Sequence, residues 1–285
     1  MLAKCRAKQP KQPFKADDAP WKTGYGGGGE QPLETDMNAQ LPRFAVVVPM
    51  KNEADNIDLL IGEIESACQG ENFEAIFVDD GSTDATLARL RQAASLKPWV
   101  RVLHHPVSGG QSAAIHSGVN AARAPIICTM DGDGQNPPSE IPRLVAPLLG
   151  DNIAPDLGLV AGQRAKRQDT LSKKIASRLA NGIRQSILQD NTRDTGCGLK
   201  AFRRDAFLDL PFFNHMHRYL PALFSAYGWR VAHVDVGHRH RHAGTSNYNN
   251  LQRALVGIHD LIGVSWLIKR RKTVRPQDIG PSSHE

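Results

Sequence analysis

The fold is indicated most strongly by the segment Thr129-Met130-Asp131-Gly132-Asp133-Gly134-Gln135-Asn136-Pro137-Pro138. It overlaps the end of an apolar run, residues 124–130, that predicts a buried strand. Because alternate side chains of an extended segment point the same way, Asp131, Asp133 and Gln135 are expected to converge on one hard cation. These oxygens leave coordination positions for a substrate diphosphate, so the segment predicts a site for Mg²⁺ or Mn²⁺. Taken alone, the segment also fits an Asp/Gly turn between a strand and a helix.

Two earlier segments repeat this pattern of a buried strand followed by a polar loop. The apolar run Phe44–Met50 leads into Lys51-Asn52-Glu53, and the run 74–78 leads into Asp79-Asp80-Gly81-Ser82-Thr83-Asp84. Helical segments separate the three strands. This order predicts an open, mostly parallel α/β sheet flanked by helices, with the ligand beyond the carboxyl ends of the strands.

Further elements extend this predicted sheet. Later strands are expected at residues 100–104, 157–162, 199–204 and 231–238. Helices are expected after Asn52, after Asp84, and over residues 111–122 and 171–188, where small or apolar residues recur at helical spacing. The paired glycines before residue 111 are expected to allow tight packing at a helix start.

Composition limits the classes of partner. The chain has 285 residues, with 35 Lys and Arg against 29 Asp and Glu, and its formal charge of +6 predicts an anionic partner. Nucleic acid is not expected, because the acidic strand ends would repel a phosphate backbone and basic residues do not alternate with aromatic ones. The four cysteines lie far apart without metal or disulfide spacing, which is typical of a reducing cytoplasm.

Four motifs, taken in order, resemble those of family 2 (GT-A) glycosyltransferases, in particular the polyprenyl-phosphate sugar transferases related to dolichyl-phosphate mannose synthase. The motifs are Val48-Pro49…Asn52-Glu53, Val78-Asp79-Asp80-Gly81-Ser82-Thr83-Asp84, Asp131-Gly132-Asp133-Gly134-Gln135-Asn136-Pro137-Pro138 and Arg241-His242-Ala243-Gly244-Thr245-Ser246-Asn247-Tyr248. The resemblance spans residues 44–250 and implies a GT-A fold and a transferase that uses a nucleotide sugar.

The resemblance also implies a donor site. Its nucleotide-sugar-binding residues would be Pro49, Asn52, Glu53, Asp79, Asp80, Asp131 and Gln135. Asp131, Asp133 and Gln135 would hold the metal, and Asp133 is expected to be catalytic. Lys51 stands where the family often has Tyr, so no stacking on the nucleotide base is expected from this position.

The expected acceptor is a lipid phosphate, which needs cations rather than a general base. Its second pKa, near 6 for phosphomonoesters, leaves it largely dianionic at neutral pH. Arginine suits such a ligand because its fork binds phosphate oxygens bidentately. The residues expected to bind the acceptor phosphate are Arg164, Arg167, Arg218, Arg241 and Ser246, with Arg241 also expected to be catalytic. Asn247 replaces a Lys that usually follows Ser246 in the family, and Asp194 matches a family loop near the acceptor channel.

The domain organisation follows from composition. Residues 1–40, rich in Lys, Pro, Gln and Gly, predict a disordered leader before a GT-A domain over 41–250. Residues 251–275 are apolar, are interrupted by His259-Asp260 and end in a run of cations. They predict an amphipathic helix that lies on an anionic membrane surface or docks on the domain's own core. Residues 276–285 predict a disordered tail.

The predicted activity is therefore inverting, metal-dependent transfer of a sugar from a nucleotide sugar to a polyprenyl phosphate. Direct attack of the lipid phosphate on the anomeric carbon would invert its configuration. We expect a cytoplasmic enzyme, peripheral on the inner face of the membrane, with a small membrane protein as a further candidate partner. The alternatives are a GT-A transferase that acts on a glycan hydroxyl and a catalytically silent binding subunit.

Overall fold

A computed structural model describes residues 41–150, 153–164, 182, 184–188, 190, 192, 194–239 and 250–274. The predicted leader and tail lie outside these residues, as do Arg167, Arg241 and Ser246. The predicted strands are all present. They are β1 (Phe44–Met50), β2 (Phe73–Asp80), β3 (Val100–His105), β4 (Ile126–Thr129), β5 (Leu157–Arg164), β6 (Lys200–Arg203) and β7 (Arg230–Val236).

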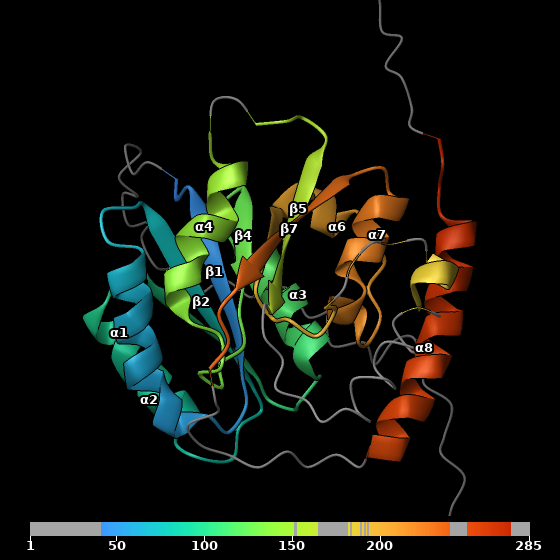
Figure 1. Cartoon of the computed structure of the whole chain (residues 1–285). Coiled ribbons are helices and arrows are strands. Elements are labelled where there is room, and N and C mark those ends of the chain that lie inside the picture. Colours follow the sequence, from blue (N-terminus) through green and yellow to red (C-terminus); the bar gives the residue numbers. More distant parts are fainter. Residues whose placement is uncertain are drawn as a thin grey trace, which may run out of the picture. The chain divides into compact units, whose positions relative to one another are not determined.

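These strands form one seven-stranded sheet in the order β3-β2-β1-β4-β6-β5-β7. Strands β1 to β4 pair in parallel, and β7 is parallel to β5, whereas β6 runs antiparallel to both of its neighbours. The carboxyl ends of β1, β2 and β4 therefore meet at one edge of the sheet, as predicted (Figure 1).

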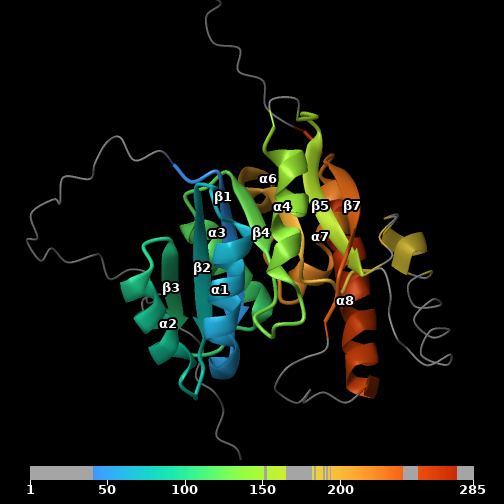
Figure 2. The same ribbon diagram turned by 60° about the vertical axis from the view of Figure 1, so that its left-hand side comes forward.

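Helices cover both faces of the sheet (Figures 1 and 2). The helices are α1 (Ile57–Ala67), α2 (Thr86–Leu96), α3 (Gln111–Ala121), α4 (Ile141–Val145), α6 (Arg204–Leu208), α7 (Leu220–Ala226) and α8 (Asn250–Arg270). Short 3₁₀ turns are η2 (Ala54–Asn56), η3 (Pro138–Glu140), η4 (Ala146–Leu148) and η5 (Met216–Arg218). Buried residues of α1, α2 and α4 belong to one core cluster, and those of α3, α6, α7 and α8 belong to another.

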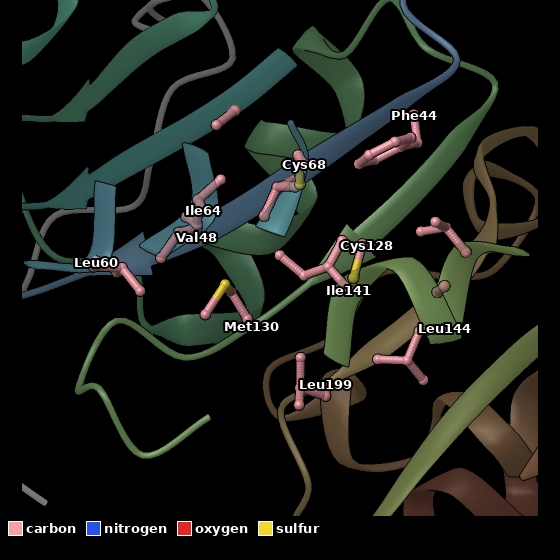
Figure 3. Close-up of a cluster of buried hydrophobic side chains, with 14 of the residues drawn as sticks. Phe44, Val48, Leu60, Ile64, Cys68, Cys128, Met130, Ile141, Leu144 and Leu199 are labelled. Atoms are coloured by element: carbon pink, nitrogen blue, oxygen red, sulfur yellow. The ribbon is translucent and has the colours of Figure 1, made fainter. Parts of the chain in front are cut away.

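Strand β1 contributes residues to both clusters because its side chains alternate between the two faces of the sheet. Val46 and Val48 pack in the first cluster, Ala45 and Val47 pack in the second, and all four are fully buried. Figure 3 shows the first cluster, in which Cys128 of β4 joins residues of α1 and α4. Cys128 is thus a core residue of its strand.

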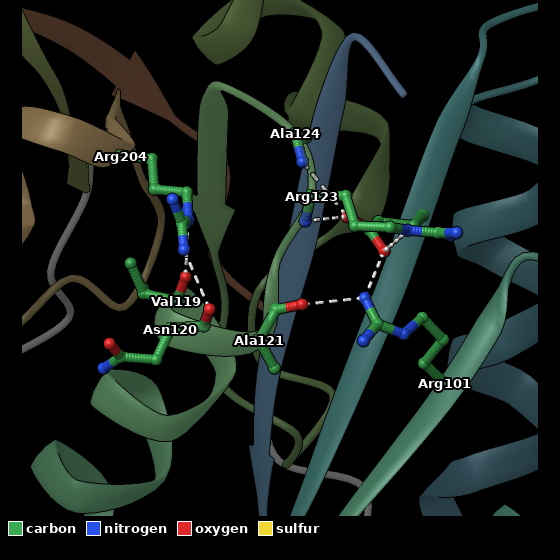
Figure 4. Close-up of polar contacts among 8 residues, drawn as sticks. Arg101, Val119, Asn120, Ala121, Arg123, Ala124 and Arg204 are labelled. Carbon is green, nitrogen blue, oxygen red and sulfur yellow. Dashed lines mark hydrogen bonds and ion pairs between the residues drawn. The ribbon is translucent and has the colours of Figure 1, made fainter. Parts of the chain in front are cut away.

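A buried carboxylate, Glu74, lies near the amino ends of the strands and is 1% exposed. It accepts hydrogen bonds from Arg101 Nη1 at 2.6 Å and from the backbone N–H of Arg123 at 2.7 Å. Arg101 and Arg204 also donate to the last carbonyls of α3, where cations are favoured by the helix dipole (Figure 4). This end of the sheet is thus occupied by structural contacts, which agrees with the predicted ligand site at the opposite edge.

Helix α8 docks on the domain through only part of its surface. Val264 is 1% exposed and Leu261 and Ile268 pack beside it, whereas Ile262 and Trp266 are 65% and 60% exposed. The predicted C-terminal helix is therefore present and contacts the core. Of the helices in the described part of the chain, none combines the length and the hydropathy that a membrane-spanning helix requires.

Candidate active site

Thr129 ends β4, and the chain then turns instead of continuing as a strand. The backbone N–H of Gln135 donates to Asp133 Oδ1 at 3.1 Å, and Gly134 has a φ of 73°. The expectation of an extended segment with alternating side chains is therefore wrong here, and the Asp/Gly turn is present. The two carboxylates still lie close enough that Asp133 raises the pKa of Asp131.

Asp131 is held by amide donors on both of its carboxylate oxygens. Gln111 at the start of α3 donates to Oδ1 at 2.7 Å, and Asn136 donates to Oδ2 at 3.1 Å. Burial is the main reason that its pKa is raised, and the Asp133 carboxylate is the second. Each oxygen keeps a lone pair for a further ligand. Such a pair of crowded carboxylates is the environment that a divalent cation stabilises.

A pocket of about 330 Å³ opens beside Asp131. It is lined by Gln111, Ile115, Thr129, Met130, Asp131, Thr195, Gly196, Cys197, Gly198, Lys200, His217, Arg218 and Leu220. These residues come from α3, from the end of β4 and the turn after it, from the loop before β6 and the first residue of β6, from η5 and from the start of α7. The pocket therefore brings the predicted metal residue Asp131 and the predicted phosphate ligand Arg218 into one site.

The loop before β6 is fixed against the end of β4. Thr129 Oγ1 donates to the Gly198 carbonyl at 2.9 Å, and Lys200 Nζ donates to the Cys197 carbonyl. Lys200 is only 3% exposed, and burial lowers its pKa. Asp131 and Asp194 act on this ammonium in the opposite direction, because both carboxylates favour its charged form.

Arg164 reaches this loop from the end of β5. Its Nε and Nη2 donate to the two oxygens of Asp194 at 2.6 and 2.8 Å, which is a bidentate pair of low exposure. The hydrogen bond to Asp194 raises the pKa of Arg164. Arg164 thus lies behind Gly196 at the pocket wall, with its guanidinium orientation fixed by a carboxylate.

The loops after β1 and β2 are joined by hydrogen bonds. The backbone N–H of Asn52 donates to Ser82 Oγ at 3.0 Å, and Asn52 Oδ1 accepts from the Thr83 N–H at 2.8 Å. Glu53 accepts from the side chain of Asn56 at 2.6 Å. Pro49 lies half-buried within β1. Direct contact of Pro49, Asn52 and Glu53 with a nucleotide stays a prediction.

Asp79 and Asp80 are paired with the histidines opposite them in β3. Asp79 contacts His104 Nδ1 at 2.7 Å, and Asp80 contacts His105 Nδ1 at 2.8 Å. Asp80 also accepts from Ser108 Oγ and from the backbone N–H groups of Gly109 and Gly110. Those distances are 2.6, 2.8 and 2.9 Å.

These hydrogen bonds indicate a structural role for Asp80. Burial alone would raise its pKa, but the hydrogen bonds from Ser108, His105 and the two glycines lower it. Asp80 therefore fixes the two-glycine loop that precedes α3, and this arrangement was not foreseen from the sequence. Recognition of the base and ribose by Asp79 and Asp80 stays a prediction.

Several residues of this site were not identified as functional from the sequence. They are Gln111, Thr129, Gly198 and Lys200, together with Ser112, whose Oγ lies 2.7 Å from His217 Nδ1. Lys200 could have been identified from the sequence, since a lysine in an otherwise apolar strand suggests a buried charge. Among the described residues, no group of three or more His, Cys, Asp and Glu could hold a metal, so Asp131 and Asp133 would need other oxygen ligands.

The sheet topology and the acidic turn define a glycosyltransferase of the GT-A fold. Residues 45–210 match the model of glycosyl transferase family 2, and the chain belongs to this family. The predicted fold, family and enzyme class are thereby confirmed.

Similar curated proteins include bacterial undecaprenyl-phosphate 4-deoxy-4-formamido-L-arabinose transferases. The protein from Aeromonas hydrophila is 33% identical over 230 residues, which cover 79% of this chain and 68% of the relative. The protein from Pectobacterium carotovorum is 35% identical over 220 residues, which cover 76% of this chain and 65% of the relative. The chain thus spans about two thirds of the length of these relatives.

Two solved structures share the fold at lower identity. Glucosyl-3-phosphoglycerate synthase from Mycobacterium tuberculosis, in complex with UDP, has a TM-score of 0.58 at 22% identity and covers 81% of this chain and 82% of its own. The mannosyltransferase PcManGT from Pyrobaculum calidifontis, in complex with GDP-Man and Mn²⁺, has a TM-score of 0.57 at 18% identity. That alignment covers 84% of this chain and 67% of PcManGT.

Proposed function

We propose that this protein transfers a sugar from a nucleotide sugar to a polyprenyl phosphate, with inversion at the anomeric carbon. The observation that carries the proposal is the pocket that both Asp131 and Arg218 line. Asp131 belongs to the acidic turn, which suits a metal-bound diphosphate, and Arg218 is a cation that suits an anionic acceptor. The names of the undecaprenyl-phosphate relatives support the same acceptor class.

The proposed metal is Mg²⁺ or Mn²⁺, held by Asp131 and Asp133 with the amide oxygen of Gln135 and substrate or water oxygens. The two carboxylates fit a hard cation, because burial and the Asp133 carboxylate raise the pKa of Asp131 even though the charge of Lys200 acts in the opposite direction. When bound, the cation would neutralise the charge of the nucleoside-diphosphate leaving group. The Mn²⁺ complexes of proteins with the same fold support this assignment.

The acceptor side of the pocket favours a phosphate over a hydroxyl group. A hydroxyl acceptor needs a general base. Among the described residues that line the pocket, Asp131 is the one carboxylate, and it is assigned to the metal. His217 also lines the pocket, but burial lowers its pKa to about 3, which makes it a weak base. A phosphate dianion needs no base. Arg218 lines the pocket and is proposed to bind it, and Arg164 lies behind Gly196 as a second proposed cation.

Arg167, Arg241 and Ser246 complete the proposed phosphate site, although they lie outside the described residues. The support for Arg241 is its closeness in sequence to Arg239. The Arg239 backbone N–H donates to the Gln135 carbonyl at 2.9 Å, which ties the chain just before Arg241 to the acidic turn. We assign Arg241 to the acceptor phosphate and Asp133 to the metal as the two residues most directly involved in transfer.

We further propose that α8 holds the enzyme on the inner face of the cytoplasmic membrane. Ile258, Ile262 and Trp266 are 59%, 65% and 60% exposed and recur at every fourth position, which places them on one side of the helix. Lys269 and Arg270 end the helix, and Arg271 and Lys272 follow. Each cation near an anionic surface contributes about 1 kcal/mol. A small membrane protein remains a proposed further partner.

The test of the transfer reaction uses the full chain with a panel of UDP- and GDP-sugars, a short polyprenyl phosphate and Mg²⁺ or Mn²⁺. The expected product is a polyprenyl-phosphate sugar with an anomeric configuration opposite to that of the donor, measured by mass spectrometry and NMR. Transfer only to glycan hydroxyl groups would replace this function with the alternative transferase. Absence of transfer to every acceptor, with intact nucleotide binding, would indicate a binding subunit.

A further inference from the structure

The imidazole ring of His217 stands between Ser112 and the pocket. Ser112 Oγ lies 2.7 Å from His217 Nδ1, and the backbone N–H of His217 points to the same oxygen at 3.4 Å. His217 lines the pocket, whereas Ser112 is buried beneath it at 3% exposure. The ring edge that carries Nδ1 therefore faces the protein, and the edge that carries Nε2 faces the pocket.

The contact with Ser112 decides which ring nitrogen carries the proton. Among the described residues, His217 Nδ1 is the one acceptor that the Ser112 hydroxyl hydrogen reaches. A buried hydroxyl that donates to no acceptor is costly, so Ser112 donates to Nδ1. The neutral ring must then carry its proton on Nε2, where it is available to a ligand in the pocket.

The first turn of α3 connects this histidine to the acidic turn. Gln111 donates to Asp131 Oδ1 at 2.7 Å, and the next residue, Ser112, orients His217. Two neighbouring residues of one helix thus hold the side chains of Asp131 and His217, and both of these side chains line the same pocket. A hydrogen-bond donor fixed beside the proposed metal site suits a polar ligand such as a sugar.

We propose that His217 donates a hydrogen bond from Nε2 to a hydroxyl oxygen of the donor's sugar, and that Ser112 positions the ring for this contact. The inference rests on the proposed function and assigns a specificity-determining residue within it. The contact would select sugars that present an acceptor oxygen at that position. A site built to pair with a hydroxyl discriminates strongly against a sugar that lacks it.

The chemistry of the ring favours a sugar over a phosphate as its ligand. Burial, together with the charges of Lys200 and Arg218, lowers the pKa of His217 to about 3, so the ring is neutral at physiological pH. A neutral donor adds little to the binding of a phosphate dianion when a charged donor, Arg218, lines the same pocket. It is sufficient for an uncharged hydroxyl group.

The test compares the binding of nucleotides with and without the sugar. Isothermal titration calorimetry in Mn²⁺ measures the affinity of the full chain for GDP, UDP and a panel of GDP- and UDP-sugars. His217→Asn removes the distal donor, and it should weaken binding of the best nucleotide sugar about tenfold while leaving the parent nucleoside diphosphate unchanged. His217→Gln, whose amide reaches the position of Nε2, should restore most of that affinity.

Ser112→Ala should give part of the same selective loss, because the ring is no longer oriented. His116→Asn is the matched control, since His116 lies on α3 and contacts Asn120 of the same helix instead of lining the pocket. Circular dichroism melting verifies that each variant folds. If Ser112→Ala does not fold, the comparison of His217→Asn with His217→Gln still decides the result.

Three outcomes would overturn the inference. Equal loss of affinity for the nucleoside diphosphate and the nucleotide sugar would assign His217 to the nucleotide or to the fold. Unchanged donor binding with a raised KM for polyprenyl phosphate would assign it to the acceptor. Unchanged values in His217→Asn would remove it from recognition altogether. If the wild-type chain bound no nucleotide sugar, the proposed function itself would fail.

Discussion

Gly198 lies directly against the carboxylate of Asp131, and a Cβ atom on residue 198 would stand 2.3 Å from Asp131 Oδ2. Thr129 keeps this glycine in place by its hydrogen bond to the Gly198 carbonyl. No side chain fits between the loop and the carboxylate without displacing one of them. The glycine therefore determines where the proposed metal ligand points.

Gly198→Ala should consequently impair the metal site more than the fold. The new methyl group would push the Asp131 carboxylate away from Gln111 and Asn136, and we expect at least a tenfold loss of Mn²⁺-dependent activity, about 1.4 kcal/mol. Activity measured over a range of Mn²⁺ concentrations checks this. Gly62→Ala is the control, because nothing lies within 4 Å of its added Cβ. It should keep full activity, and equal losses in both variants would contradict the explanation.

Asp133→Asn should leave the fold stable and reduce transfer by roughly a hundredfold to a thousandfold, the usual effect of removing one electrostatic stabiliser. The amide keeps the size of the side chain but loses the charge that would bind the cation. Removing divalent cations with EDTA should abolish transfer, and Mg²⁺ or Mn²⁺ should restore it. Full activity in excess EDTA would exclude the proposed metal from the reaction.

Asp194→Asn should affect the acceptor more than the donor. It weakens the bidentate pair that orients Arg164, so we expect the KM for polyprenyl phosphate to rise about tenfold while nucleotide affinity is retained. Asp156→Asn disrupts the exposed pair with Arg230 on the same sheet and serves as the control. A fall in nucleotide affinity in Asp194→Asn, with normal acceptor kinetics, would assign Arg164 to the donor.

Glu74→Gln should destabilise the protein in a pH-dependent manner. Burial alone would raise the pKa of Glu74, but its hydrogen bonds with Arg101, Arg123 and Ala124 lower it below the usual 4.5. The ionised form thus stabilises the fold above about pH 4.5, and this contribution is lost as the pH falls through the lower folded-state value. We expect a loss of about 1.5–3 kcal/mol at pH 7 that shrinks on acidification.

Urea unfolding of wild type and Glu74→Gln between pH 3 and pH 7 measures this difference. Glu71→Gln is the control, because its ion pair with Arg43 is largely exposed. A constant difference across the whole range would mean that the charge of Glu74 is not the cause.

Trp266→Glu should weaken binding to vesicles of anionic phospholipid without unfolding the domain, because this side chain is exposed and Val264 makes the contact with the core. Deletion of α8 would be a poor test, since it would uncover that core. Leu96→Glu, which changes a residue 73% exposed on α2, is the control. Vesicle sedimentation at low and high salt measures both, and high salt should release the wild type. Equal binding by both variants would argue against α8 as the anchor.

The strands and the family could be predicted from the sequence because both depend on local patterns. Apolar runs that end in polar loops identified all seven strands, and four short motifs identified the family. The position of Asp131 and Asp133 just after a buried strand was predicted correctly, and their role as metal ligands stays a prediction. The backbone conformation of this turn was not predicted, since the contact of Asp133 Oδ1 with the Gln135 N–H competes with an extended conformation.

Contacts between strands could not be predicted, because they depend on register. Asp79 and Asp80 stand opposite His104 and His105 in the parallel pair of β2 and β3. A shift of this pairing by one residue would remove both contacts. The pairing of Arg164 with Asp194 could not be predicted either, since these residues are thirty positions apart and their contact depends on the pairing of β5 with β6.

The chain segment that carries His217 and Arg218 is attached to α8 on either side of these residues. His215 Nδ1 lies 2.8 Å from Asp260 Oδ2, and the Tyr219 hydroxyl donates to the Gly257 carbonyl at 3.4 Å. The pocket wall is therefore attached directly to the proposed membrane helix. If α8 lies among the lipid headgroups as proposed, its depth would set the height of the pocket above the bilayer. That height would determine how far an acceptor phosphate must rise out of the membrane plane to meet the sugar.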